Sequence, residues 1–324
     1  MLTPDHLGST DAEYYPVFLR SFASGRPPMV DLYHQIGGQY VLYCEAHAVF
    51  SDNARWRLLD NNVRRLFVRF RDGELRAGDL GLEDVMSLPD DRVSPYLKAR
   101  LLYYAIAANS TTAVTAPITS GSIAAARQTT DTVVDYLVRN PRALIPVIKL
   151  MRHDPSLVTH SSNVCIYAVG LGQLVGIGSD ALANLSLGAF LHDLGMVRVP
   201  PGIVGKPGPL TPDEWAIMHQ HPKWGVEILS DDIRGQSTVR TIIYQHHERL
   251  DGSGYPLKIG KADIHLMARI VGLVDKYDAL TSDRPYRPRM QPFGALREIQ
   301  EDMASQFDRD LFVPLLTMLG PGQG

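Results

Sequence analysis

Cysteine is scarce in this chain of 324 residues, which contains only Cys44 and Cys165. So few thiols exclude a disulfide scaffold, and their lack of partners is typical of a protein in a reducing compartment. Neither cysteine belongs to a CxxC pair, so the sequence also argues against a thiolate metal site. We therefore expect a cytoplasmic protein in which any metal is bound by other side chains.

An excess of basic charge is also missing. The chain has 32 Lys and Arg against 35 Asp and Glu, which gives a formal net charge of −3 at pH 7. Proteins that bind nucleic acid polymers usually carry a basic field, because the phosphate backbone is polyanionic. The charge balance therefore predicts no nucleic acid polymer as a partner.

Apolar runs long enough for a membrane are lacking as well. The N-terminal segment 1–16 is acidic and has no apolar core, so it does not look like a signal peptide. Residues 101–126 and 155–179 contain no Asp, Glu, Lys or Arg, but both contain Ser, Asn and Gly. A spanning helix needs about 20 predominantly apolar residues. We expect two buried helical stretches and no membrane association.

The length predicts two domains, because an ordinary compact core takes about 100–150 residues. Short β-branched and aromatic runs at Tyr40–Cys44 and Leu66–Phe70 predict strands in the first part of the chain. Between them, Ser51 can cap a helix that ends near Asn61. These signals predict a small α/β domain over residues 1–90, with an accessory or regulatory role.

Residues 91–324 are predicted to form a mainly α domain, with a motif-bearing core over 150–313. Apolar periodicity predicts helices over 157–177, 180–194, 212–230, 235–247, 266–280 and 292–305. Thr211, Pro212 and Glu214 match a capping box with proline at the first helical position, so a helix is expected to begin there.

Five of the 11 histidines and two aspartates recur at helix positions of this domain, with successive groups about 25–32 residues apart. They are His160, His192, Asp193, His221, His246, His247 and Asp275. An antiparallel bundle returns each helix to a common layer, so this spacing can gather all seven side chains. Imidazole with carboxylate is a ligand set for Fe, Mn or Zn. Two such metals about 3.5–4 Å apart suit phosphoester hydrolysis.

The remaining six histidines show no such pattern: His6, His34, His47, His153, His219 and His265. His219 lies two residues before His221, and on a continuous helix that separation is a rotation of about 200°. Only one of the two can then face a given metal. We choose His221, because Pro222 follows it as in the family pattern described next.

Several segments together resemble one known family. They are His192-Asp193-Leu194-Gly195, His221-Pro222, His246-His247-Glu248, the run Asp251-Gly252-Ser253-Gly254-Tyr255-Pro256, Asp275 to Asp278, and Arg284 to Arg287. Their order and spacing over residues 150–310 are similar to those of the HD-GYP family, helical phosphodiesterases of the HD superfamily that hydrolyse cyclic di-GMP. The resemblance implies an HD-superfamily helical bundle that carries a metal centre.

The resemblance also implies roles for single residues. The seven histidines and aspartates match the family's metal ligands, with Asp193 as the bridge and with His192 and Asp193 as the catalytic pair. His160 matches a ligand that in some members serves mainly a third metal, alongside a glutamate where this chain has Ser156. A centre of two divalent ions, Fe or Mn, is therefore favoured over one of three.

Substrate contacts follow from the same likeness. Tyr255, Arg284 and Arg287 match residues expected to contact the nucleotide, since guanidinium groups can donate two parallel bonds to a phosphate. Gly254 is expected to shape the loop at the edge of the site. In a second layer, Glu248 is expected to orient a ligand histidine and Asp278 to contact the centre.

One departure from the family pattern affects the functional prediction. The family has a phosphate-binding lysine three residues after the HD aspartate, and here that position is Met196, whose thioether carries no charge. Losing such a contact costs about 1.5–3 kcal/mol, or roughly ten- to more than a hundredfold in rate or binding. Arg198 and Lys206 are the nearby cations that could replace it.

The leading hypothesis is a metal-dependent phosphodiesterase that cleaves cyclic di-GMP to pGpG, GMP or both. One alternative is a receptor that binds cyclic di-GMP with weak or no turnover, and another is an HD-type phosphohydrolase of a different nucleotide. In each case the partner is a small cyclic dinucleotide or related nucleotide. A homodimer or a signalling protein that contacts the first domain is also considered.

Overall fold

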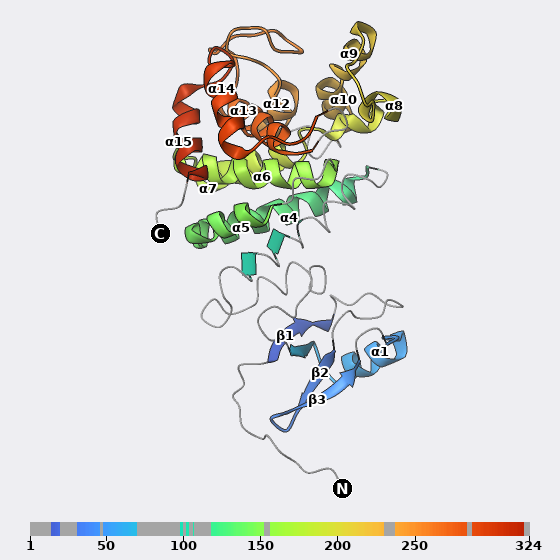
Figure 1. Ribbon diagram of the computed structural model, residues 1–324. Helices are drawn as coiled ribbons and strands as arrows, with labels where there is room; N and C mark the ends of the chain where they lie inside the picture. Colours follow the sequence, from blue (N-terminus) through green and yellow to red (C-terminus); the bar gives the residue numbers. More distant parts are fainter. Residues whose placement is uncertain are drawn as a thin grey trace. The chain divides into compact units, whose positions relative to one another are not determined.

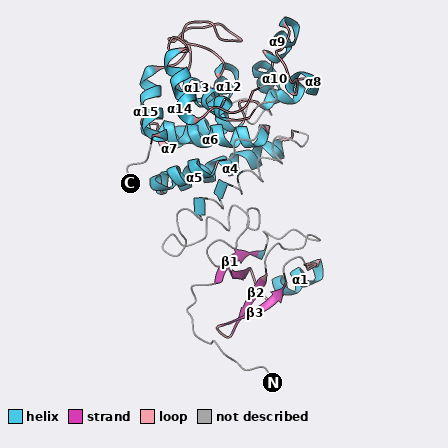
Figure 2. Ribbon diagram, in the orientation of Figure 1, coloured by secondary structure: helices cyan, strands magenta, loops and turns pink. Residues whose placement is uncertain are grey.

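The structure, a computed structural model, describes residues 14–19, 31–45, 48–69, 98–99, 102–103, 106, 118–151, 156–229, 237–283 and 287–320. The chain divides into two compact units, residues 1–105 and residues 106–324. Within these described ranges, the strands lie in the first unit and the long helices in the second (Figure 1 and Figure 2). The predicted boundary near residue 90 falls outside the described residues and stays a prediction.

The first unit contains an antiparallel sheet with the strand order β1-β4-β2-β3. Its elements are β1 (Tyr14–Phe18), β2 (Leu32–Ile36), β3 (Gln39–Cys44), α1 (Asp52–Asp60) and β4 (Arg65–Arg69). The β2–β3 hairpin turns at Gly37 and Gly38, whose φ angles of +58° and +84° favour glycine. The Ser51 hydroxyl accepts a hydrogen bond from the amide of Ala54 at 3.2 Å, which caps α1 as predicted.

The small α/β unit was predicted, but β1 and β2 were not. Pro16 interrupts the strand signal of β1, because proline cannot donate to a sheet ladder. The strand is tolerated at the edge of the sheet, where Pro16 lies opposite Phe67. Apolar side chains of three strands, including Val17, Leu32 and Val68, are fully buried and form the core beneath the sheet.

The second unit consists of helices around the buried helix α6. The longer ones are α4 (Ser120–Arg139), α6 (Leu157–Leu174), α7 (Ser179–Phe190), α12 (Ser237–Gln245), α13 (Leu266–Thr281), α14 (Pro292–Glu301) and α15 (Arg309–Leu319), and the short α5 (Leu144–Leu150) follows α4. Shorter ones are the 3₁₀ helix η4 (Leu194–Arg198), α8 (Pro201–Val204), α9 (Pro212–Met218) and α10 (His221–Ile228). The predicted mainly α fold is confirmed.

Helix α6 lies at the centre of this unit and packs against α4, α7, α13 and α15 (Figure 1). Every residue from Thr159 to Gly172 is buried, which explains why this stretch contains no Asp, Glu, Lys or Arg. A helix that is apolar all round is typical of a protein core. Among the described residues, no helix combines the length and apolar character that crossing a membrane requires.

The prediction of one continuous helix over 212–230 is wrong. Helix α9 ends at Met218, and α10 starts a new helix at His221, with Pro222 in its first turn. Proline lacks the N–H that would continue α9, but it suits the first turn of a new helix. The predicted capping box is present, since the Thr211 hydroxyl and the Glu214 carboxylate each accept the other residue's amide.

The segment 180–194 is likewise shorter than predicted, because α7 ends at Phe190 and His192 and Asp193 lie in the turn before η4. The 3₁₀ helix η4, directly after this turn, packs against α10 through two glycines, Gly195 and Gly225. A Cβ at Gly195 would overlap the carbonyl of His221 and the amide of Gly225. The close approach brings Asp193 next to His221.

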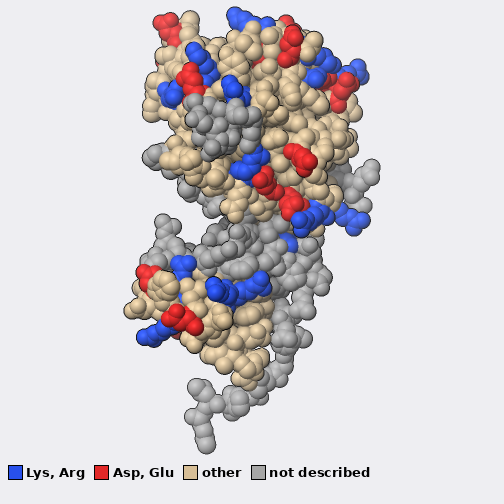
Figure 3. Space-filling view, turned by 180° about the vertical axis from the view of Figure 1, so that it is seen from behind, with Lys and Arg blue, Asp and Glu red and all other residues tan. Residues whose placement is uncertain are grey.

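Charged side chains of both signs are interspersed over the described residues of the face drawn in Figure 3. Charge on this face is therefore local, in line with the near balance of acidic and basic residues in the chain.

Candidate metal centre

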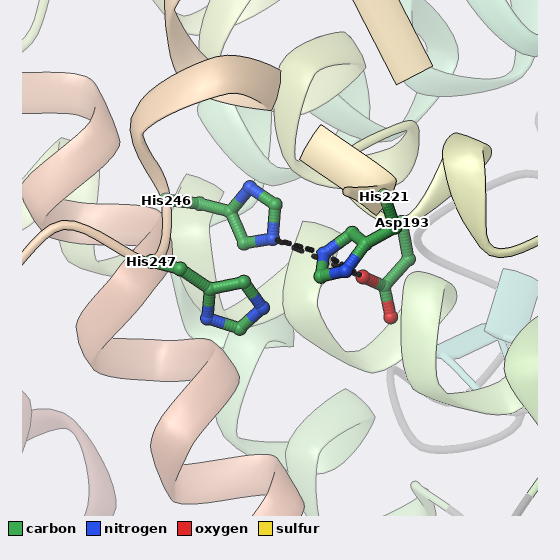
Figure 4. A group of neighbouring side chains, drawn as sticks. All are labelled: Asp193, His221, His246 and His247. Atoms are coloured by element: carbon green, nitrogen blue, oxygen red, sulfur yellow. Dashed lines mark hydrogen bonds and ion pairs between the residues drawn. The ribbon is translucent and has the colours of Figure 1, made fainter. Parts of the chain in front are cut away.

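The structure brings all seven predicted ligand residues together as two adjacent groups. In each group, the atoms that can bind a metal lie within 4.8 Å of one another. We call the fully buried set the inner group; it consists of His160, His192 and Asp275. The partly exposed set is the outer group; it consists of Asp193, His221, His246 and His247 (Figure 4).

Asp193 connects the two groups. Its Oδ1 lies 3.3 Å from Nε2 of His221 and 3.8 Å from Nε2 of His246. Its Oδ2 lies 3.6 Å from Nε2 of His192 and 3.8 Å from Nε2 of His160. One oxygen thus faces each group, which is the arrangement of a carboxylate that bridges two ions.

Asp275 spans both groups in the same way, which the sequence reasoning missed. Its Oδ1 lies 3.1 Å from Nε2 of His160 and 3.8 Å from Nε2 of His192. Its other oxygen, Oδ2, is 3.9 Å from Nδ1 of His247. The two groups are therefore joined by two carboxylates from separate elements, the turn after α7 and the helix α13.

Three of the histidines are oriented by the backbone of their own helix or turn. Nδ1–H of His192 donates to the carbonyl of Ala189 at 2.7 Å, that of His221 to Met218 at 2.9 Å, and that of His246 to Ile243 at 2.8 Å. Each acceptor lies three residues earlier in the chain. Donation from Nδ1 leaves the lone pair on Nε2, which faces the cluster.

His160 is oriented by a carboxylate instead. Its Nδ1 lies 2.7 Å from Oδ2 of Asp278, which is fully buried, and the other oxygen of Asp278 accepts from Asn163 at 2.8 Å. Burial lowers the pKa of His160, but the bonds to Asp275 and Asp278 outweigh this and raise it to about 10. Asp278, which was predicted to contact the centre from behind the ligands, thus contacts it through His160.

Four other side chains of the cluster, His221, His246, His247 and Asp193, are held in their metal-binding protonation states at neutral pH. Burial lowers the pKa of His246 to about 3, and it lowers the pKa values of His221 and His247 as well. Burial alone would raise the pKa of Asp193, but the surrounding histidines lower it to about 2. Neutral imidazoles and ionised carboxylates are the forms that bind metal.

Two features indicate that this cluster fits divalent cations. Nε2 of His192 is buried and has no hydrogen-bond partner within the described part of the chain. Nε2 of His221 and Nε2 of His246 are only 3.3 Å apart, although both rings donate through Nδ1 and so direct lone pairs at each other. A buried acceptor without a partner costs free energy, and a cation between these nitrogens removes that cost.

The loop after α12 folds back onto its own beginning. Gly254 is buried, and a Cβ there would overlap the backbone from His247 to Arg249. The Glu248 carboxylate accepts from the amides of Leu257 at 2.5 Å and Ile259 at 3.2 Å. The Glu248 oxygens thus hold the loop, and a role of Glu248 in orienting a ligand histidine stays a prediction. Gly254 likewise faces the backbone of the chain, which explains why this position needs glycine.

Tyr255 is placed against the outer group by this fold of the loop. Its amide donates to the carbonyl of His247 at 3.3 Å, and its ring stacks on the His247 ring with centroids 4.6 Å apart. The opposite face of the ring stacks on His219 at 3.9 Å. A contact between Tyr255 and a nucleotide stays a prediction.

The basic residues expected to bind phosphate are engaged elsewhere. The Arg287 guanidinium donates to the carbonyls of Ala279 and Leu280 and so caps the C-terminal end of α13. Arg284 lies outside the described residues. Arg198 and Lys206 form ion pairs of 2.6 Å with Glu227 and Glu214, so neither is a ready substitute for the lysine missing at Met196.

A family model described as an HD domain matches residues 145–311, more than half of the chain. The chain belongs to the HD domain family. The matched range includes the whole of both ligand groups, from His160 to Asp275.

Curated relatives of this HD domain include three bacterial phosphodiesterases. Cyclic di-GMP phosphodiesterase PA4108 of Pseudomonas aeruginosa is 33% identical over 59% of this chain and 46% of that protein. 3'3'-cGAMP-specific phosphodiesterase 2 of Vibrio cholerae is 35% identical over 49% of this chain and 30% of that protein. Cyclic di-GMP phosphodiesterase response regulator RpfG of Xanthomonas campestris is 37% identical over 43% of this chain and 37% of that protein. The chain spans less than half the length of each.

A solved structure shares the fold. It is described as Bd1817, a HDG"Y"P protein from Bdellovibrio bacteriovorus, and it has a TM-score of 0.64 and 19% identity over 95% of this chain and all of that one. Together with the HD domain match and the named relatives, this confirms the resemblance to HD-GYP proteins predicted from the sequence.

Proposed function

We propose that this HD domain is a metal-dependent phosphodiesterase of cyclic dinucleotides, with cyclic di-GMP as the first candidate substrate. The observation that carries the proposal is the pair of carboxylates, Asp193 and Asp275, each with one oxygen toward the inner group and one toward the outer group. Such an arrangement suits two divalent ions. The names of the relatives, which include cyclic di-GMP and cGAMP phosphodiesterases, support the choice of substrate.

The seven residues would hold the ions, and their imidazole and carboxylate donors suit divalent metals of this kind. We propose two Fe or Mn ions, as the resemblance to the HD-GYP family implies. Bound ions of this kind lower the pKa of a water molecule and neutralise charge on phosphate oxygens. The protein's own contribution is orientation. The carbonyls of Ala189, Met218 and Ile243 fix the direction of three imidazoles, and Asp193 lies where it can serve both ions.

A third ion is not expected. Ser156, at the position where some family members carry a glutamate, caps α6 by accepting from the amide of Thr159 at 3.1 Å. Its hydroxyl also donates to Thr159 Oγ1 at 2.8 Å. We therefore propose that His160, which is 3.1 Å from Asp275, serves the two-ion centre.

A receptor that binds cyclic di-GMP with slow turnover is the second candidate. It is favoured by the absence of a lysine at Met196 and by the engagement of Arg198, Lys206 and Arg287 in other contacts. Fewer cations near the centre mean less stabilisation of charge that develops on the phosphate. Calorimetry that detects tight binding without product would support this candidate, and a Met196→Lys variant should then gain activity.

The test is hydrolysis by Mn²⁺- or Fe²⁺-loaded protein of cyclic di-GMP, of 3′3′-cGAMP and of a linear nucleotide, with products separated by chromatography. The Asp193→Ala variant should lose at least about a hundredfold in rate, because it removes a bridging ligand. Asp135→Ala, an exposed aspartate paired with Arg139 on α4, is the matched control. Equal product from wild type and Asp193→Ala would overturn the proposal, and the ratio of pGpG to GMP would identify the end product.

The role of the sheet-containing unit also remains a proposal. We propose an accessory or regulatory function, through a homodimer or a signalling partner. Light scattering of the full chain with and without cyclic di-GMP tests whether the oligomeric state responds to the nucleotide.

A further inference from the structure

Four aromatic rings form a row from the surface of α9 to the outer group. Trp215, which is 47% exposed, has its ring centroid 5.3 Å from that of His219. His219 stacks on Tyr255 at 3.9 Å with an interplanar angle of 22°. Tyr255 stacks on His247 at 4.6 Å and 30°. The Tyr255 ring is thus enclosed between two imidazoles, only one of which belongs to the metal-binding candidates.

His247 differs from the other four histidines of the centre in how its ring is held. Each of the others has its Nδ1 fixed by a carbonyl or carboxylate at 2.7–2.9 Å. Within the described residues, His247 has no hydrogen bond of that kind, and its Nδ1 lies 3.9 Å from Asp275. Its ring contacts the rings of His246 at 4.1 Å and His221 at 4.9 Å, both of them ligand candidates. Tyr255, which lies outside both ligand groups, covers a face of the ring at 4.6 Å and so limits its tilt.

The Tyr255 ring needs support from its other side to do this. The backbone of Tyr255 is fixed by the bond from its amide to the His247 carbonyl and by the close packing of Gly254. These contacts hold the backbone of Tyr255 and do not by themselves fix the orientation of its ring. His219 covers the face of the ring that points away from His247, and stacked rings of this type hold each other at a preferred offset.

We propose that His219 is a positioning residue, which holds the imidazole of His247 in its metal-binding orientation through Tyr255. The proposal rests on the metal centre assigned under the proposed function. His219 lies in neither ligand group, so it acts through the stack and not as a ligand. The break between α9 and α10 makes this possible, because it turns His219 onto Tyr255 while His221 faces the centre.

The test compares His219→Ala, which removes the stack, with His219→Phe, which keeps a ring without its nitrogens. His34→Ala, on β2 of the first unit, is the matched control. Metal-free full-length proteins are titrated with Mn²⁺ by calorimetry, and with Co²⁺ by visible absorption, which reports ligand geometry. Thermal melting of the metal-free proteins shows whether folding is affected.

We expect His219→Ala to bind one of two Mn²⁺ ions about tenfold more weakly, a loss typical of residues that orient a ligand, and to change the Co²⁺ spectrum. His219→Phe and His34→Ala should match wild type, and all metal-free proteins should melt alike. Wild-type affinity in His219→Ala, or equal losses in the Ala and Phe variants, would overturn the inference. So would a wild-type protein that binds no Mn²⁺. A wild type that binds two ions but hydrolyses nothing would instead contradict the phosphodiesterase proposal alone.

Discussion

The inner and outer groups are made of similar side chains but are supported in different ways. His160 and Asp275 project from the long buried helices α6 and α13, and the ring of His160 is fixed by the carboxylate of Asp278. In the outer group, Asp193 and His247 lie in turns and stay partly exposed. Their positions depend on close backbone packing at Gly195 and Gly254.

This difference shows which parts of the fold fix the positions of the ligand side chains. Two of the three inner residues, His160 and Asp275, take their positions from helices packed in the hydrophobic core, which is dense and rigid. The third, His192, lies in the same turn as Asp193. The outer group takes its geometry from turns, glycine contacts and a ring stack, which cost less to disturb. Substitutions near the outer group should therefore alter metal binding locally, whereas those near the inner group should also alter stability.

The largest effect is expected where the two groups meet. Asp275→Asn removes a carboxylate that lies 3.1 Å from His160 and 3.9 Å from His247, so both ions should bind more weakly. Hydrolysis should fall at least about a hundredfold. Metal analysis of the purified protein beside the rate measurement checks this, with Asp135→Asn as control. Retention of one fully bound ion would show that Asp275 serves only one group.

A smaller and more selective effect is expected at Asp278. Asp278→Asn keeps the shape but weakens the acceptor for Nδ1 of His160, so metal affinity should fall about ten- to a hundredfold. The loss should be confined to the inner group, because Asp278 contacts His160, Asn163 and Ser282. Calorimetry with Mn²⁺ resolves the two binding steps. Equal weakening of both steps would contradict the separate support of the two groups.

The smallest effect is expected on how the stability of the metal-free protein depends on pH. A histidine of the inner group and one of the outer group should change this stability in opposite directions as the pH rises. Hydrogen bonds to Asp275 and Asp278 raise the pKa of His160 from 6.5 to about 10 despite its burial, so its stabilisation is present below pH 6.5 and lost as pH rises toward 10. Burial lowers the pKa of His246 from 6.5 to about 3, so its contribution is present above pH 6.5 and lost as pH falls toward 3.

Thermal melting of the metal-free chain should accordingly be highest near neutral pH and decline on both sides. His160→Gln should flatten the alkaline side, and His246→Gln should reduce the decline on the acidic side, where His221 and His247 act in the same direction. A melting temperature that does not change between about pH 7 and pH 9 would show that His160 is not protonated in the metal-free fold.

Much of the site could be predicted from the sequence because its chemistry is carried by residue types at a recurring helix spacing. Imidazoles and carboxylates at His160, His192, His221 and Asp275 stood out for that reason, and the structure places them together. The predicted capping box at Thr211 and the helix cap at Ser51 are local, so they needed no knowledge of the fold.

The contacts that the sequence did not predict join segments brought together by turns. The loop after α12 folds back, and Glu248 and Gly254 both hold it through contacts with its own backbone. Arg287, expected to contact phosphate, caps the C-terminal end of α13, and its contact with phosphate stays a prediction. A side chain's type shows what it can bind, and its partner depends on which backbone groups the fold leaves unpaired nearby.

By itself, the sequence determined the helical class of the second unit and the ligand residues available, because both depend on residue type and periodicity. The lack of a cation at Met196 followed from the resemblance to the HD-GYP family. Only the tertiary structure decided that Asp275 spans both groups, that backbone carbonyls orient three of the imidazoles, and that His219 covers Tyr255. Those contacts depend on how turns and helices pack against one another. A shift of a helix along its axis by one residue, about 1.5 Å, would point its side chains in another direction.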